Sequence, residues 1–163
     1  MRGFVIVVLA LMLSACATVQ KLEAAGDVHA LLVAIRDNDR PTFNALVDRR
    51  ALKAETSDRL MLEARRDPRV PTSLAAILAP GLAEIAGDAL IRPEVFRAVA
   101  VHYGYRRDMK IPGPIGISTM LRQMPDGRVC AVSKKDGPCL LIFAKAPDGR
   151  WKLSGFEGDL SML

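Results

Sequence analysis

Near His102 the spacing of apolar residues in this 163-residue chain changes, and the change limits the folds open to it. Before this point, apolar residues such as Val28, Leu31 and Ile35 recur at the spacing of one helix face. After it, short apolar segments alternate with turn signals such as Pro-Asp-Gly, as in strands joined by tight turns. The sequence therefore predicts an α+β fold, with N-terminal helices packed on a C-terminal four-stranded antiparallel meander.

Capping residues and prolines set the expected helix boundaries. We expect Asp27 to be the N-cap of the first helix and Asp37-Asn38-Asp39 to end it. Pro41 fits the first turn of a second helix, where its missing N–H is not needed. Further boundaries are a cap at Thr56 or Ser57 for a third helix, a break or kink at Pro80-Gly81, and a last helix starting at Pro93-Glu94.

Strand-like segments fill most of the C-terminal half. The glycines and prolines of 111–116 indicate a loop that cannot be helical. The four expected strands are Ile117–Met124, Arg128–Ser133, Cys139–Lys145 and Arg150–Phe156.

The N-terminus has the layout of an export signal. A short charged start is followed by an uninterrupted apolar run, Phe4–Leu13, which is too short to span a bilayer. The next residues, Leu13-Ser14-Ala15-Cys16, resemble the lipobox of bacterial lipoproteins, which implies cleavage before Cys16 and lipid on its thiol. The alternatives are an ordinary signal peptide or a buried strand that contains Cys16. We divide the chain into a signal peptide (1–15), a tether (16–26) and a single α+β domain (27–163).

This resemblance implies a location as well. A lipid-anchored protein belongs to the cell envelope, with membrane lipid as its partner through acylated Cys16. An anionic envelope component or an envelope protein is the further partner to consider. Ala17, rather than Asp, follows the cysteine, and by resemblance to other Gram-negative lipoproteins this favours the periplasmic face of the outer membrane. Nucleic acid is not an expected partner there.

Three cysteines are an odd number for an exported protein. If Cys16 carries lipid, Cys130 and Cys139 remain as a pair in a compartment that permits a disulfide. A hairpin with Cys130 opposite Cys139 brings the thiols together. A second register centres the turn on Asp136-Gly137, places Cys130 opposite Phe143 and leaves both thiols unpaired. The turn composition favours the second register, and the export signal favours the bridge.

The C-terminal half is basic. Residues 102–154 contain ten Lys or Arg and four Asp or Glu. The simplest interpretation is a solvated sheet face, and the alternative is contact with an anionic envelope component. Arg65-Arg66 and Arg106-Arg107 lie next to acids, Asp67 and Asp108, which favours solvated local ion pairs over anion sites.

Catalytic motifs are absent from the sequence, and no cofactor or metal is expected. We therefore weigh two functions: a non-catalytic envelope lipoprotein with a binding or accessory role, or a small-ligand pocket protein or enzyme with a cone-shaped cavity. A deep pocket would favour the second function, and a filled core would favour the first. The expected pocket residues are His102, Tyr103, Tyr105, Trp151 and Phe156.

The helical half resembles a known family. The segments Leu32–Asp39, Phe43–Asp48, Ala51–Lys53 and Leu82–Leu90 with Pro93-Glu94 are similar to the bacterial proteins grouped as domain of unknown function 2939, and Trp151–Leu153 resembles the family's last strand. The resemblance implies export and an α+β domain, but no activity. Many members carry a plain hydrophobic anchor where this chain has its lipobox. The order of helices and strands is also similar to the cone-shaped nuclear-transport-factor-2-like folds, an analogy of fold alone.

Overall fold

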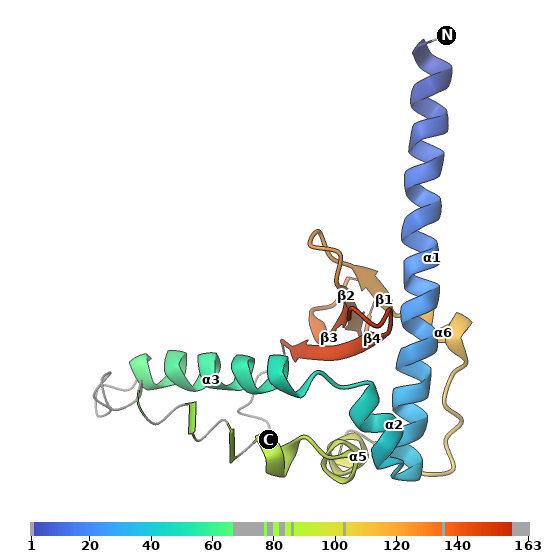
Figure 1. Ribbon diagram of the computed structural model, residues 1–163. Helices are drawn as coiled ribbons and strands as arrows, with labels where there is room; N and C mark the ends of the chain where they lie inside the picture. The colour runs from blue at the N-terminus through green and yellow to red at the C-terminus, as the bar shows by residue number, and fades with distance from the viewer. Residues whose placement is uncertain are drawn as a thin grey trace.

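The computed structural model describes residues 2–66, 77, 80–81, 84–85, 87–102, 104–134 and 136–157. It has the expected α+β architecture, with helices before a four-stranded antiparallel sheet of order β1-β2-β3-β4 (Figure 1). The helices are α1 (Arg2–Asp37), α2 (Arg40–Ala45), α3 (Arg49–Arg66), α5 (Pro93–His102) and α6 (Pro114–Ser118). The strands are β1 (Leu121–Gln123), β2 (Val129–Val132), β3 (Cys139–Lys145) and β4 (Trp151–Phe156).

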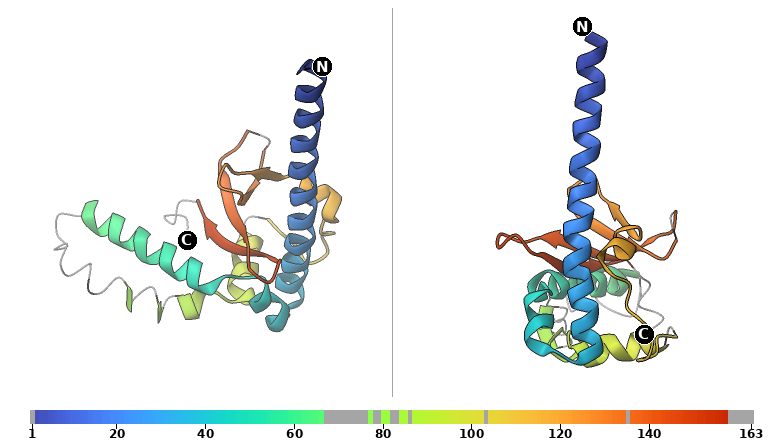
Figure 2. Two further views of the ribbon diagram at one scale, coloured as in Figure 1. Left: turned by 45° about the horizontal axis from the view of Figure 1, so that its top comes forward. Right: turned by 90° about the vertical axis from the view of Figure 1, so that its right-hand side faces the viewer.

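Helix α1 is the longest element, and its N-terminal part projects well beyond the rest of the molecule in all views (Figures 1 and 2). It ends as the sequence predicts. Asn38 adopts a left-handed conformation (φ 59°), and the Asp39 N–H bonds back to the carbonyl of Ala34 at 2.9 Å. This pairing satisfies a carbonyl of the last turn and stops the helix.

Asp39 then starts α2, its carboxylate accepting a hydrogen bond from the Thr42 N–H at 3.1 Å, with Pro41 in the first turn as expected. The predicted start of the third helix is wrong. Asp48 accepts from the Ala51 N–H at 3.0 Å, so α3 begins at Arg49, well before Thr56. Thr56 lies inside the helix and bonds the carbonyl of Leu52 at 2.8 Å.

The segment between α2 and α3 also covers an edge of the sheet. Val47 forms a parallel bridge with Leu153 of β4, since Asp48 N–H donates to the Leu153 carbonyl and Leu153 N–H to the Leu46 carbonyl, each at 2.9 Å. An unpaired strand edge is a template for unwanted pairing, and here a local segment satisfies part of it.

Two of the three expected turns have the glycine conformation and the aspartate hydrogen bond that are typical of Pro-Asp-Gly turns. Gly127 and Gly149 have positive φ angles of 82° and 81°, which glycine adopts without strain. Asp126 and Asp148 each accept a hydrogen bond from the backbone N–H two residues later, at 3.1 Å. The third turn closes with Gly137 N–H on the Lys134 carbonyl, and its Lys135 lies outside the described residues.

The main core lies between α1, α2 and one face of the sheet. The apolar face of α1 contributes Ala24, Ala25, Val28, Leu31 and Ala34. The largest fully buried side chains include Trp151, Phe43, Phe143, Leu46 and Leu153. A smaller cluster on the other face of the sheet contains Cys130, Val132, Cys139 and Ile142.

The first expected strand is shorter than the sequence indicated, and the preceding loop is partly helical. Helix α6 occupies Pro114–Ser118, so β1 begins only at Leu121. Pro114 at the start of a helix loses no hydrogen bond, and Ile117 is buried. Because α6 contacts α1, tertiary packing outweighs the local loop composition.

The expected tether is not a separate segment. Residues 16–26 are helical and continuous with the rest of α1, and Ala24 and Ala25 are fully buried. Asp27 is therefore inside α1 rather than at its N-cap. The expected last helix is present as α5, starting at Pro93. Pro80 and Gly81 are helical, but the flanking residues 78–79 and 82–83 lie outside the described residues. The break or kink expected at Pro80-Gly81 therefore stays a prediction.

Candidate functional site

Cys16 lies in the N-terminal half of α1. The N-terminal part of this helix projects from the molecule (Figure 1). Buried Ala24 is eight positions further along the helix than Cys16, and at 1.5 Å per residue this corresponds to about 12 Å. Between them, Val19 and Leu22 are 57% and 49% exposed. The cysteine is therefore connected to the folded body by continuous helix.

Polar contacts fix the part of α1 that follows Cys16 to the sheet. Gln20 and Gln123 of β1 are hydrogen bonded through their side chains at 2.5 Å. The Glu23 carboxylate pairs with Lys145 of β3 at 2.8 Å, and this hydrogen bond lowers the pKa of Glu23 below its ordinary value. The Asp27 carboxylate accepts a hydrogen bond from the backbone N–H of Trp151, in β4, at 2.7 Å. These contacts hold one face of α1 against the sheet.

Cys130 and Cys139 form a disulfide, with their Cα atoms 5.6 Å apart. Neither expected register is correct. Cys130 pairs with Ile142, and Val132 pairs with Cys139, because Leu140 is an extra residue in β3 without a partner in the ladder. Such a bulge reverses the alternation of side chains, which brings Cys139 to the face that carries Cys130 and Ile142.

The structure places the described members of the expected pocket in different surroundings. Trp151 is 1% exposed and lies in the main core. Phe156 is partly buried and packs against this core. The Arg59 guanidinium lies 4.6 Å from the centre of the Phe156 ring. Tyr105 is half-buried and His102 is exposed at the end of α5, while Tyr103 lies outside the described residues.

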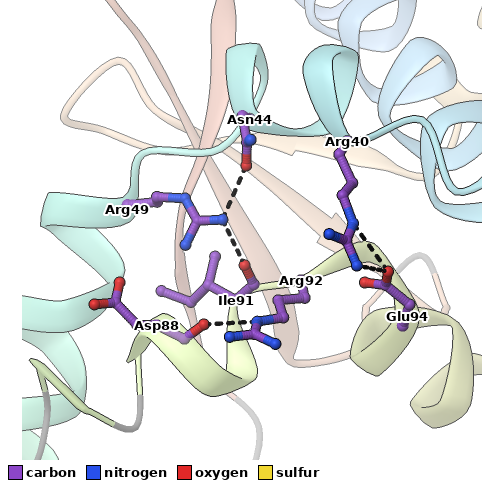
Figure 3. A network of polar contacts seen from close by, with 7 residues as sticks. All are labelled: Arg40, Asn44, Arg49, Asp88, Ile91, Arg92 and Glu94. Carbon is purple, nitrogen blue, oxygen red and sulfur yellow. Dashed lines mark hydrogen bonds and ion pairs between the residues drawn. The ribbon is translucent and has the colours of Figure 1, made fainter.

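A network of ionic and polar contacts joins α2 and α3 to residues 88–94 (Figure 3). Arg49 donates to the side chain of Asn44 at 2.9 Å and to the carbonyl of Ile91 at 2.7 Å. Arg40 pairs with Glu94 at 2.5 Å. This pairing lowers the pKa of Glu94 to about 2, far below its ordinary value. The network is structural, since each cation in it is bonded to a protein group.

Lys53 extends this network from α3. Its ammonium contacts Glu84 at 2.5 Å and Asp88 at 2.8 Å, and its side chain is only 16% exposed. The hydrogen bonds to Asp88 and Glu84 raise the pKa of Lys53. An open hollow of about 490 Å³ lies beside it, lined by Arg49, Arg50, Lys53, Ala54, Ser57, Pro80 and Glu84.

A second open hollow, of about 580 Å³, lies at the other end of α1 from Cys16. Its lining residues are Arg36, Asp37, Asn38, Arg97 and Arg107. The sequence predicted solvated local pairs for Arg106 and Arg107. Arg106 forms the expected ion pair with Asp108 at 3.3 Å, whereas Arg107 lines the second hollow. Among the described residues of the expected pocket, His102, Tyr105, Trp151 and Phe156 line neither hollow.

Sequence reasoning did not find this second group. Its three arginines come from separate segments, at the end of α1, within α5 and after it. No single motif joins them, and the fold brings them together through contacts between α1 and α5. The adjacent Arg106-Arg107 pair was the one signal available in the sequence.

Within the described residues, no three His, Cys, Asp or Glu side chains are grouped as a metal site would require. No helix in the described part of the chain is both long and apolar enough to cross a membrane.

A family model described as "Protein of unknown function (DUF2939)" matches residues 4–99. The chain belongs to this family. The DUF2939 match covers α1, α2, α3 and the first part of α5, which includes the segments whose likeness the sequence indicated. It ends before the sheet, so the resemblance of Trp151–Leu153 to the family's last strand stays a prediction. No curated protein and no solved structure matches the chain, and the analogy to nuclear-transport-factor-2-like folds is likewise only a prediction.

Proposed function

We propose that this DUF2939 protein is a lipid-anchored protein of the bacterial cell envelope, with a non-catalytic binding or accessory role. The observation that carries the proposal is the position of Cys16. It ends a lipobox-like motif and lies on a projecting helix that is continuous with the folded body. A lipid on Cys16 would therefore hold the domain at a membrane with little chain in between.

The interior of the domain supports a non-catalytic role. A ligand cavity between sheet and helices would need space where Trp151, Phe43 and Phe143 are fully buried. Burial of these aromatic rings against α1 and α2 stabilises the fold instead. The Cys130–Cys139 disulfide agrees with an oxidising compartment.

Metabolic labelling with radioactive palmitate tests the anchor. The wild-type protein should take up label and sediment with membranes, whereas Cys16→Ala should do neither. The double variant Cys130→Ala/Cys139→Ala is the matched control, since it retains Cys16 and should be labelled like wild type. Label in Cys16→Ala, or a membrane-bound Cys16→Ala protein, would contradict the proposal.

Ala17 favours delivery to the outer membrane, on its periplasmic face. Density-gradient separation of the two membranes should recover the protein with outer-membrane markers. Changing Ala17→Asp should move it to the inner membrane. Recovery of the wild-type protein with the inner membrane would contradict the location and leave the lipid anchor intact.

A further inference from the structure

The geometry points to a phosphate-binding site in the hollow at the C-terminal end of α1, and we propose a phosphate monoester as its ligand. Arg36, Asp37 and Asn38 contribute from the end of α1, Arg97 from α5, and Arg107 from the segment that follows α5. Three parts of the chain thus present guanidinium groups to one open space of about 580 Å³.

The number of cations without a protein partner distinguishes this hollow from the one beside Lys53. There, Lys53 contacts two carboxylates and Arg49 donates to Asn44 and Ile91. Of the three lining cations, only Arg50 makes no hydrogen bond or ion pair with any described residue. In the hollow at the end of α1, only Arg36 has such a partner. Arg97 and Arg107 make no hydrogen bond or ion pair with any described residue.

The single acid in the lining is already occupied. Asp37 accepts two hydrogen bonds from Arg36, at 2.7 Å to Nε and 2.8 Å to Nη2. Asp37 therefore neutralises Arg36 and leaves the charges of Arg97 and Arg107 uncompensated. Three arginines and one aspartate give the lining a net charge of +2.

This charge matches one class of ligand. A phosphate monoester carries a charge of about −1.5 to −2 at neutral pH and presents three acceptor oxygens. Guanidinium groups bind phosphate through paired N–H donors, and they are more weakly hydrated than ammonium groups. A sulfate ester has similar oxygens but a single negative charge, so it should bind less tightly.

The neighbouring Tyr105 adds a polar group without a partner. Its hydroxyl is buried and makes no hydrogen bond with any described residue. Tyr105 lies two residues before Arg107, which lines the hollow.

The position along α1 favours a water-borne ligand, and this step alone rests on the proposed function. Cys16 and Arg36 are twenty positions apart on one continuous helix, which corresponds to about 30 Å. Charges in salt solution are screened over roughly 8–10 Å. With the anchor at Cys16, the lipid headgroups around it are therefore poor candidates, and a soluble phosphate ester or an envelope polymer carrying such groups is favoured.

Calorimetric titration of the full-length wild-type protein purified in non-ionic detergent tests the site, with methyl phosphate and methyl sulfate as probes at pH 7.5. Methyl phosphate should bind saturably and at least fivefold more tightly than methyl sulfate. The variant Arg97→Gln/Arg107→Gln should lose at least tenfold in affinity. The matched control Arg106→Gln/Lys134→Gln removes the same charge outside the hollow and should bind within twofold of wild type.

Three results would overturn the proposal: no saturable binding of methyl phosphate, equal affinity for the two esters, or equal losses in both double variants. Unchanged melting temperatures will show that the variants are folded. Adding phosphatidylglycerol to the micelles should leave the methyl phosphate affinity unchanged, and competition by this lipid would contradict the water-borne source. The titration does not depend on the lipid. Failed titration with successful palmitate labelling would therefore contradict the phosphate site alone. Successful titration with failed labelling would contradict the lipid anchor alone.

Discussion

Asp27 joins the first helix to the last strand through a single hydrogen bond. Its residue type and its place before an apolar helix face suggested a local cap, but it accepts instead from the Trp151 N–H, 124 positions later in the chain. Arg150 lies 3.8 Å away on the same carboxylate. Because Trp151 is almost fully buried, its backbone donor has little access to water as an alternative partner.

We predict that Asp27→Ala lowers the free energy of unfolding by about 1–2 kcal/mol, the cost of leaving a buried donor without an acceptor. Asp27→Asn keeps a side-chain oxygen and should lose less. Urea denaturation measures both. Glu23→Ala, one turn earlier on α1, removes an exposed ion pair with Lys145 and should change stability little. Equal effects of Asp27→Ala and Glu23→Ala would refute the assigned role.

The disulfide makes a second prediction for individual residues. It closes a short loop, with Cys130 and Cys139 nine positions apart, so it should contribute at most about 3 kcal/mol. Reduction should lower the melting temperature by no more than about 10 °C, and the domain should stay folded. Differential scanning calorimetry with and without reductant measures this shift. Cys130→Ala/Cys139→Ala should not respond to reductant, and an equal response in that variant would exclude the disulfide as the cause.

Among the helices and strands, those defined by local chemistry were predictable from the sequence. The end of α1 at Asn38, Pro41 in the first turn of α2 and the glycine turns at Gly127 and Gly149 follow from φ preferences and side-chain caps. These signals act within a few residues, and tertiary contacts do not oppose them here.

Elements defined by distant contacts were not predictable in the same way. Helix α6 forms at a proline-glycine segment because Ile117 is buried in the core and α6 contacts α1. The bulge at Leu140 depends on pairing between β2 and β3, and no residue there marks it. For the same reason the arginines of the hollow, on three separate segments, could not be grouped before the fold was known.

The Arg40–Glu94 pair, which joins α2 to α5, makes stability depend on pH. The Glu94 pKa is about 2 in the folded protein, against an ordinary value of 4.5, because Arg40 stabilises the carboxylate. A lowered pKa means that this contribution is complete above about pH 4.5 and is lost as the pH falls towards 2. We predict that Glu94→Gln loses this part of the pH dependence.

Urea unfolding of wild type and Glu94→Gln between pH 2 and 7 measures the contribution. The difference between the two proteins should be small, since Arg40 is 64% exposed, and should be largest near neutral pH. Asp108→Asn, in an exposed pair with Arg106, is the control and should follow wild type. A difference that grew towards pH 2 would contradict the assigned pairing.

At the scale of the whole molecule, α1 has two roles. Its C-terminal half supplies one side of the core, and its N-terminal half projects away from the sheet with Cys16 on it (Figure 2). The contacts of Gln20, Glu23 and Asp27 with three strands make the lower part of this helix one body with the sheet. A lipid at Cys16 would therefore position the whole domain, with the arginine-lined hollow towards the opposite end of α1.

Intact-protein mass spectrometry of the protein extracted from membranes tests the lipid anchor most directly. The account predicts a mature chain that starts at Cys16 and carries the added mass of a diacylglyceryl group, with Cys130 and Cys139 oxidised. A chain that retains residues 1–15, or one that starts at another position without added lipid, would contradict it.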